Sequence, residues 1–356
     1  MKTVTVSASK TYDVLIGCGL LAQAGAHIRN TKDPCTVAII SNVTVWPLYG
    51  QHLAKSLCDA GFSVVFHTIG DGEAYKNSET YLQILSFLAD NHITRSDLII
   101  ALGGGVVGDI TGFTAATYLR GIDYIQIPTT LLAMVDSSVG GKTAIDLPQG
   151  KNLVGAFCQP KLVLCDPDVL STLPEQIFVD GCAEVIKYAM LYDAELFSHL
   201  MKYGTVFDRE HVICRCVELK KNAVTQDEFD VGLRQKLNLG HTIGHAIEKN
   251  SNFRISHGQA VAIGMAVITK AAVTANQCNV SVYDQLISLL KKFTLPYCVP
   301  SDASGCYGTK RLFESACSDK KRAGKTVNLI IPLQIGNCVI QKTDISQLES
   351  IIESGL

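Results

Sequence analysis

The chain has 356 residues, of which 47% are hydrophobic and 18% are charged, so it can bury a large core and is long enough for two domains. Its 31 basic and 33 acidic residues give a formal net charge of -2. That balance excludes the basic stripe that a nucleic acid or an anionic membrane requires. Local clusters of cationic side chains therefore indicate a small anionic ligand.

Cysteine usage and the apolar stretches indicate the cellular compartment. The 13 cysteines are odd in number and include no Cys-x-x-Cys pair, which is typical of reduced thiols in a cytoplasmic protein. The first residues, Met1-Lys-Thr-Val, lack the apolar run of a signal peptide. Residues 260–275 are the longest apolar stretch, but Gly264 and Lys270 interrupt it, so it is predicted to be a buried helix. We expect a cytoplasmic protein with no membrane partner.

The first half of the chain alternates between strand and helix patterns. Residues 4–6 and 12–16 are predicted to be short paired strands, followed by a helix over residues 20–29. The strand–helix alternation that comes next predicts a parallel sheet covered by helices on both faces. Its expected strands are residues 36–41, 63–68, 98–102, 124–128 and 162–165, and its expected helices are residues 47–60 and 79–91.

The pattern changes after Leu173-Pro174. From there the apolar residues follow the helical period as far as Lys292, with one short strand-like run at residues 327–332. The sequence therefore predicts an α/β fold, with a parallel-sheet domain over residues 1–173 and a mainly α-helical domain over residues 174–356.

Glycines follow the third predicted strand of the parallel sheet. The run Gly103-Gly-Gly-Val-Val-Gly-Asp109 matches G-x-G-x-x-G at a strand-to-helix turn, where backbone N–H groups can hold a diphosphate. The usual motif follows the first strand, however, and the strand after this one ends in Pro128-Thr-Thr130 without an acidic residue for the ribose. A standard Rossmann dehydrogenase is therefore disfavoured.

The second strand of the parallel sheet ends in Gly70-Asp-Gly-Glu-Ala-Tyr-Lys76. Its carboxylates could accept hydrogen bonds from ribose hydroxyls, while Lys76 adds positive charge nearby. Each glycine-rich segment alone is compatible with a turn that carries solvated charges. Together the two segments predict a dinucleotide at the carboxyl edge of the sheet.

Two lysines beside glycines lie in residues 134–155. The segment before Lys142 superficially resembles a phosphate-binding loop, but Val135 occupies the place of the first Walker A glycine, so ATP binding is not indicated. Lys142 and Lys151 suit the carboxylate or phosphate of a small substrate, and a solvated loop is an equal alternative.

Histidines in the second half predict a metal site. His241 and His245 are four residues apart on one helix face, but Thr242 stands where a zincin has its general base, so metalloprotease chemistry is disfavoured. A random histidine pair at this spacing is more often structural. Glu184, His241 and His257 together offer a carboxylate and two imidazoles. This set suits zinc or cobalt with open positions for substrate.

Cationic and polar side chains accompany these ligands. Glu184 and Lys187 share a helix face and form either an exposed ion pair or an inward-facing site pair. Lys220, Arg234 and Asn238 precede His241 at spacings that suit neighbouring helices facing one cleft. Such a lining around a metal indicates a polyanionic ligand.

Taken in order, these motifs resemble the 3-dehydroquinate synthase family from about residue 70 to residue 265, with a weaker match at Asp319-Lys-Lys321 and residues 329–332. The resemblance implies a Rossmann-like NAD domain, a helical domain that binds metal and substrate, a homodimer and a place in the shikimate pathway. The segments that carry it are 103–109, 128–130, 136–142, 150–152, 183–187, 237–245 and 257–258.

The family resemblance also assigns residues. It implies that Glu184, His241 and His257 are the zinc or cobalt ligands, that His245 stands by the substrate phosphate, and that Arg120 reaches the partner subunit's site. The other implied substrate-site residues are Asp136, Lys142, Asn152, Lys187, Lys220, Arg234, Asn238 and one of Lys320 and Lys321. The implied NAD contacts are Asn42, Asp71, Gly72, Glu73, Ala74, Tyr75, Lys76, Gly103, Gly104, Gly105, Val106, Val107, Gly108, Asp109, Thr129, Thr130, Lys142, Lys151, Val169, Leu170, Ser171 and Thr172.

The implied activity is that of a carbon–oxygen lyase. It converts 3-deoxy-D-arabino-heptulosonate 7-phosphate to 3-dehydroquinate and phosphate through transient oxidation by NAD, phosphate elimination, re-reduction and an intramolecular aldol closure. Asp230 and Gln259 replace glutamates that are usual in the family, which leaves a related sugar-phosphate cyclase as an alternative. A metal-dependent NAD polyol dehydrogenase and a non-catalytic scaffold with a structural metal are more distant alternatives.

Overall fold

The computed structural model describes residues 1–252, 254–300, 307–320 and 325–356, with the side chains of residues 318–320 outside that description. The chain divides into two compact units, each with its own core. Unit 1 contains residues 1–174 and 209–229, and unit 2 contains residues 175–208 and 230–356. Residues 209–229, which a division at residue 173 assigns to the second domain, thus fold with unit 1.

Unit 1 is built on a seven-stranded sheet with the order β1-β2-β9-β6-β5-β3-β4. All neighbours pair in parallel except β1 and β2, which pair antiparallel at one edge, as the sequence predicts. The strands are β1 (Lys2–Ser7), β2 (Thr11–Ile16), β3 (Thr36–Asn42), β4 (Ser63–Ile69), β5 (Leu98–Gly103), β6 (Asp123–Pro128) and β9 (Leu162–Cys165).

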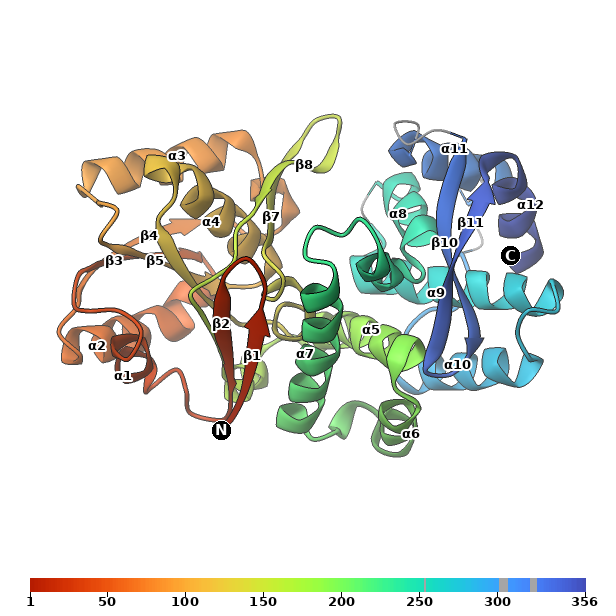
Figure 1. Ribbon diagram of the computed structural model, residues 1–356, viewed down its shortest axis with the longest axis horizontal. Helices are drawn as coiled ribbons and strands as arrows, with labels where there is room; N and C mark the ends of the chain where they lie inside the picture. The colour runs from red at the N-terminus through yellow and green to blue at the C-terminus, as the bar shows by residue number, and fades with distance from the viewer. Residues whose placement is uncertain (253, 301–306, 321–324) are drawn as a thin grey trace. The chain divides into compact units, whose positions relative to one another are not determined.

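Helices cover both faces of this sheet, as expected. Every residue of β5 is buried, because a central parallel strand packs against helices on both sides. In Figure 1, α3 and α4 lie on one face and α1 and α2 on the other, with a core that includes Ile84, Ile99 and Ile110 on the α3–α4 side. The helices are α1 (Ala24–Arg29), α2 (Gln51–Asp59), α3 (Ser78–Asp90), α4 (Gly105–Thr117) and α7 (Arg209–Gln226), with short turns at η1 (Trp46–Gly50), η2 (Glu73–Tyr75), η3 (Tyr118–Arg120), η4 (Ala133–Ser137) and η5 (Pro167–Thr172).

Unit 1 differs from the sequence predictions in two places. The first helix begins at Ala24 instead of residue 20, because residues 20–23 form a hydrogen-bonded turn. The two lysines beside glycines lie on an antiparallel hairpin, β7 (Lys142–Leu147) and β8 (Gly150–Phe157), instead of in a loop, and Lys142 is exposed there. Gly155 allows the close pairing, since a Cβ there would lie 2.3 Å from the Thr143 carbonyl oxygen.

Unit 2 is mainly helical and packs around α9 (His257–Thr274), the predicted buried helix. Glycines let neighbouring backbones approach it, since a Cβ on Gly264 would lie 2.0 Å from the Gly240 carbonyl oxygen. A hairpin of β10 (Thr326–Gln334) and β11 (Asn337–Asp344) contains the predicted strand, while β11 was not predicted. The other helices are α5 (Glu175–Tyr192), α6 (Ala194–Tyr203), η6 (Gly204–Val206), η7 (Leu233–Asn238), α8 (His241–Asn250), α10 (Val280–Lys292), α11 (Thr309–Lys320) and α12 (Ile345–Gly355).

Two general features concern the described part of the chain. Its helices include none with the length and hydropathy needed to cross a bilayer. Its cysteines are all free thiols.

Candidate metal centre and dinucleotide edge

The carboxylate of Glu184 is buried in the middle of α5. Glu184 is 0% exposed, and Lys187, one turn further along the helix, is 1% exposed. The two side chains form an ion pair, and the alternative that this pair lies on the surface is wrong. A buried carboxylate requires charged or hydrogen-bonding partners, which makes Glu184 a strong candidate for a binding residue.

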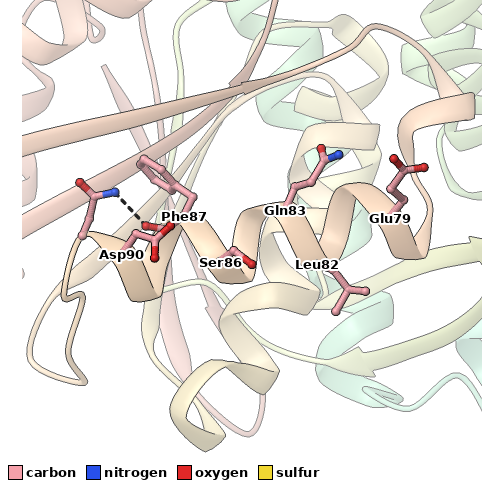
Figure 2. Close-up of a pocket in the computed structure, with 7 residues that line it drawn as sticks. Glu79, Leu82, Gln83, Ser86, Phe87 and Asp90 are labelled. Carbon is pink, nitrogen blue, oxygen red and sulfur yellow. Dashed lines mark hydrogen bonds between the residues drawn. The ribbon is translucent and has the colours of Figure 1, made fainter.

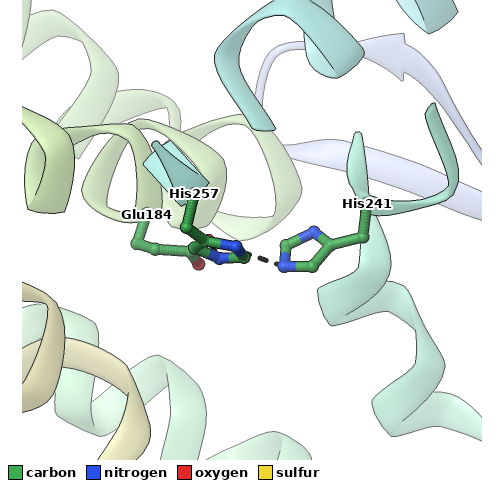
Figure 3. Close-up of side chains that lie close together, drawn as sticks. All are labelled: Glu184, His241 and His257. Atoms are coloured by element: carbon green, nitrogen blue, oxygen red, sulfur yellow. Dashed lines mark ion pairs between the residues drawn. The ribbon is translucent and has the colours of Figure 1, made fainter. Parts of the chain in front are cut away.

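Two histidines face this carboxylate from the first residues of two other helices. The Nε2 atom of His241, which begins α8, lies 3.6 Å from Glu184 Oε1, and the Nε2 atom of His257, which begins α9, lies 3.3 Å from the same oxygen. Figure 3 shows both rings directed toward the carboxylate. Gly240 positions His241, because it adopts a φ of 77° and a Cβ there would lie 2.8 Å from the Val261 carbonyl oxygen.

This donor set fits a divalent ion. Ligand atoms that each lie roughly 2.0–2.2 Å from a tetrahedral zinc ion are about 3.3–3.6 Å from one another, and each imidazole nitrogen lies at such a distance from the Glu184 oxygen. One carboxylate with two imidazoles leaves open positions, as a catalytic site requires, whereas structural zinc sites are closed and usually rich in cysteine. Ligand atoms of the three residues lie within 4.8 Å of one another.

The protonation of the two imidazoles is set by their surroundings. Burial, together with the nearby Lys187 ammonium, lowers the pKa of His241 to about 3, so this ring is neutral and offers a lone pair. Burial also disfavours a charged His257, but hydrogen bonds to Glu184 and Glu248 outweigh burial and raise its pKa to about 10. The carboxylates around His257 therefore favour positive charge at this place.

The histidine pair first noticed in the sequence is divided between two groups of candidate ligands. The ring centroids of His241 and His245 are 5.4 Å apart, but only His241 belongs to the group that contains Glu184. His245 is exposed and forms a second group with Glu248 and His257. The helical spacing thus predicted neighbouring rings but not which of them faces the carboxylate.

Asp180 holds the start of α9 against α5. Its Oδ1 accepts hydrogen bonds from the Ser256 hydroxyl and from the Gln259 backbone N–H, the latter at 3.1 Å. Gly258 lies directly on this contact, because a Cβ there would be 2.0 Å from the Asp180 carbonyl oxygen. These contacts fix the backbone on both sides of His257.

Gln259, one of the two departures from the family pattern, caps the start of α9. Its side chain accepts a hydrogen bond from the Ser256 backbone N–H at 3.3 Å and completes a capping box. The Ser256-x-x-Gln259 pattern could have shown this role. The carboxylate beside His257 is Glu248, which sequence reasoning left without a role.

In unit 1, Lys76 forms the centre of a buried polar network after β4. Its ammonium donates to Asp109 Oδ2 and to Asn152 Oδ1, each at 2.6 Å, and the residue is 4% exposed. The alternative of a solvated charge is therefore wrong for Lys76. Burial opposes its charge, but the carboxylates of Asp109 and Glu73 outweigh burial and raise the pKa of Lys76.

The glycine-rich turn joins β5 to α4 as predicted. Gly104 precedes the first residue of α4, and a Cβ on Gly103 would lie 2.7 Å from a Val107 methyl group. A Cβ on Gly108 would lie 2.6 Å from Gln126 Oε1, so this glycine allows the helix to pack closely on β6. The turn leaves the N–H groups of the first helical turn at the carboxyl edge of the sheet, where a diphosphate can bind.

The ends of neighbouring strands bring several expected NAD residues to this edge of the sheet. Asn42 ends β3, Asp71 follows β4 and accepts from the Thr44 hydroxyl, and Thr129 follows β6 and donates its N–H to the Gly103 carbonyl at 3.0 Å. The remaining expected NAD residues lie at η2 (Glu73, Ala74 and Tyr75), at Gly72, at Gly105, Val106 and Val107 on α4, at Thr130, at Lys142 and Lys151 on the β7–β8 hairpin, and at Val169, Leu170, Ser171 and Thr172 on η5.

The expected substrate residues fall in both units. In unit 1 the Lys220 ammonium on α7 forms an ion pair with Asp136 at 2.7 Å, and Arg120 is exposed in a left-handed conformation with a φ of 66°. In unit 2 Arg234 is 1% exposed on η7, which ends at Asn238. Lys321 and the side chain of Lys320 lie outside the described residues.

A pocket on the surface of α3 contains none of the residues predicted to bind NAD, metal or substrate. Figure 2 shows its lining by one face of the helix, where the Asn91 side chain donates to the Phe87 carbonyl at 2.8 Å. The lining residues are Glu79, Leu82, Gln83, Ser86, Phe87, Asp90 and Asn91.

Solved structures with the same fold include sugar-phosphate cyclases and alcohol dehydrogenases. The chain superposes on 2-deoxy-scyllo-inosose synthase complexed with carbaglucose-6-phosphate, NAD+ and Co2+ with a TM-score of 0.88 and 25% identity, covering 100% of both chains. It superposes equally well, with 26% identity and 99% and 98% coverage, on 2-epi-5-epi-valiolone synthase from Streptomyces hygroscopicus subsp. jinggangensis 5008 with NAD+ and Zn2+ bound. An iron-containing alcohol dehydrogenase, with a TM-score of 0.67 and 14% identity, shares the fold alone. The fold and the metal centre thus place the chain in the class of sugar-phosphate cyclases.

Sequence comparisons define the family within this class. Residues 66–180 match the family model for the 3-dehydroquinate synthase N-terminal domain, and residues 181–322 match the model for its C-terminal domain. The 3-dehydroquinate synthase of Streptococcus suis (strain 05ZYH33) is 42% identical over 98% of this chain and 99% of its own, and that of Clostridium acetobutylicum is 43% identical over 97% of each. The chain belongs to the 3-dehydroquinate synthase family.

Proposed function

We propose that this chain converts 3-deoxy-D-arabino-heptulosonate 7-phosphate to 3-dehydroquinate and inorganic phosphate, the reaction of its family in the shikimate pathway. The observation that carries the proposal is the convergence of Glu184, His241 and His257 in a chain that matches 3-dehydroquinate synthases over nearly its full length. The proposed enzyme is a lyase that uses NAD and one divalent ion, zinc or cobalt, and acts in the cytoplasm as a homodimer.

The roles of the two units follow from their chemistry. The turn from Gly103 to Asp109 in unit 1 holds NAD through backbone N–H groups, and the network around Lys76 keeps this turn in place. In unit 2, Glu184 and the two imidazoles hold the ion. When bound, the ion would polarise a substrate hydroxyl oxygen, and NAD would accept a hydride and return it within the same turnover.

The remaining proposed residues bind the substrate's charges and move protons. Arg234 and Lys187 are buried cations in unit 2 and suit anionic groups of the substrate, the guanidinium through paired N–H donors. His245, with its exposed imidazole, is suited to proton transfer beside the phosphate. We further propose that Asp136, Lys142, Asn152, Lys220 and Asn238 contribute to the substrate site, and that Arg120 reaches the partner subunit's site.

The test is an assay of the purified protein with the heptulosonate phosphate. We expect release of phosphate and formation of 3-dehydroquinate in equal amounts, loss of both after treatment with a chelator, and recovery on addition of zinc or cobalt. The absorbance of reduced nicotinamide should stay constant in the steady state, because each hydride is returned. Net accumulation of NADH would instead indicate a polyol dehydrogenase, and metal-independent turnover would contradict the proposed metal centre.

A further inference from the structure

A second buried carboxylate lies on the far side of the His257 ring. Glu248, in the last turn of α8, is 4% exposed, and its Oε2 atom lies 3.4 Å from His257 Nδ1. The other ring nitrogen, Nε2, lies 3.3 Å from Glu184 Oε1. The imidazole is therefore held between two carboxylates, one at each nitrogen.

The two nitrogens cannot have the same role. A neutral imidazole carries one proton, so a ring that offers the Nε2 lone pair to an ion keeps its proton on Nδ1. Nδ1 faces Glu248, and a carboxylate accepts that N–H. If Glu248 and Nδ1 held a second ion while Nε2 held the first, the ring would have to lose both protons, which is far less favourable.

We propose that Glu248 is a positioning residue that holds His257 as the Nδ1–H tautomer and directs its Nε2 lone pair toward the ion. The inference rests on the proposed metal centre and extends it to a residue with no assigned role. A carboxylate that accepts the second N–H of a metal-bound imidazole fixes the ring's orientation and makes it a more basic ligand.

The backbone and the ring of His257 are held by different residues. Asp180 fixes the start of α9 through Ser256 and Gln259, so the backbone has its own anchor. The Glu248 carbonyl accepts a hydrogen bond from the Ser251 hydroxyl at 2.7 Å, and this backbone bond does not depend on the Glu248 side chain. Substitution of Glu248 therefore tests the ring's orientation with little effect on the helices that carry it.

The experiment compares metal binding by the full-length chain and by Glu248→Ala and Glu248→Gln after removal of metal. Each protein is titrated with cobalt(II), and the visible absorption spectrum is recorded. We expect Glu248→Ala to weaken cobalt binding about 10- to 100-fold and to change the spectrum, because the ring can rotate and change tautomer. Glu248→Gln should lie between this variant and the unaltered chain, since its amide oxygen still accepts the N–H but carries no charge.

Asp193→Ala is the matched control. Asp193 is also a buried carboxylate of unit 2, 7% exposed, and it caps α6 by accepting the Leu196 N–H at 2.9 Å. Its loss should lower thermal stability, by about 1 kcal/mol, and leave cobalt affinity and the spectrum unchanged. A stability loss alone therefore cannot imitate the expected effect of Glu248→Ala.

Three results would overturn the inference. In the first, Glu248→Ala binds cobalt with the same affinity as the unaltered chain and gives the same visible spectrum. Another is an Nε2–H tautomer of His257 in the nitrogen-15 NMR spectrum of the zinc-loaded unaltered protein, which is decisive even if Glu248→Ala does not fold. The third is binding of two ions per chain with the second lost in Glu248→Ala, which would make Glu248 a ligand. Absence of cobalt binding by the unaltered chain would instead overturn the proposed metal centre itself.

Discussion

The Lys76 network of unit 1 and the Glu184 centre of unit 2 bury charge in two different ways. Around Lys76, the ammonium donates hydrogen bonds to the Asp109 carboxylate and the Asn152 amide oxygen, each at 2.6 Å. A cation of the chain itself therefore lies between the acceptor oxygens. Around Glu184, the Lys187 ammonium pairs with one carboxylate oxygen, while the other oxygen and two imidazole nitrogens converge. The first arrangement stabilises a turn, whereas the second is suited to hold an added ion. Burial of charge alone does not distinguish a structural site from a binding site, but the donor and acceptor types do.

The largest expected effect comes from His257→Ala, which removes one of three ligands. A carboxylate and one imidazole hold a divalent ion poorly, so we expect the purified variant to contain little metal and its phosphate release to fall more than about 100-fold. Metal content and phosphate release are measured on the same samples. His52→Ala, at an exposed position on α2, should change neither quantity. Full metal occupancy in His257→Ala would refute the ligand assignment.

The next effect concerns the stability of the Lys76 network. Lys76→Met leaves the Asp109 carboxylate, whose pKa is already raised by burial, without its ammonium partner. We expect a loss of about 3 kcal/mol in the free energy of unfolding, measured by urea denaturation. The control is Lys55→Met, because Lys55 and Asp59 form an ion pair of the same 2.6 Å length on the surface, with side chains 75% and 64% exposed. That variant should unfold at the same urea concentration as the unaltered chain. Equal losses in the two variants would show that burial does not strengthen the Lys76 pair.

Arg234→Ala tests whether a buried cation of unit 2 serves the substrate or the fold. Removing a guanidinium from an anion site loses charged hydrogen bonds of about 1.5–3 kcal/mol, so we expect KM for the heptulosonate phosphate to rise about 10- to 100-fold. The affinity for NAD should not change. Arg234→Lys should recover part of the loss, because it keeps the charge but not the paired donors. An unchanged KM in a variant of lowered stability would assign Arg234 to the fold.

The smallest expected effect concerns Asp97, a buried carboxylate that accepts hydrogen bonds from backbone N–H groups, whereas the Glu184 carboxylate faces two imidazoles. Asp97 accepts from Thr36 N–H at 2.9 Å and from Thr94 N–H at 2.7 Å. Burial alone would raise its pKa, but the hydrogen bonds from Thr94 and Thr36 outweigh burial and lower it. A carboxylate with a lowered folded-state pKa contributes stability above its unfolded-state pKa and loses that contribution as the pH falls toward the folded-state value.

For Asp97 this loss should begin at roughly pH 4 and continue below it. Asp97→Asn should therefore be less stable than the unaltered chain near neutral pH, by about 1 kcal/mol, and the difference should shrink in acid. Urea denaturation at several pH values measures both. A constant difference across the pH range would show that the charge of Asp97 does not contribute.

Local patterns in the sequence were sufficient for much of the fold. The strands of the parallel sheet follow from apolar runs, and the glycine turn at Gly103 follows from the lack of a side chain on glycine, which lets neighbouring groups pack closely. The buried helix predicted over residues 260–275 follows from its composition, and α9 begins three residues earlier, at His257. The first helix was predicted too long, since the apolar spacing of residues 20–23 is equally compatible with a turn.

The amino-acid sequence by itself determined the alternation of elements, the kinds of ligand that the chain offers and its family. The tertiary structure decided which groups meet: residues 209–229 with unit 1, Lys76 with Asp109 and Asn152, and His257 between Glu184 and Glu248. The physical reason is distance along the chain. Short-range patterns follow from backbone geometry, whereas these contacts join residues on different elements, from nine to 76 positions apart, and depend on how whole helices and strands pack.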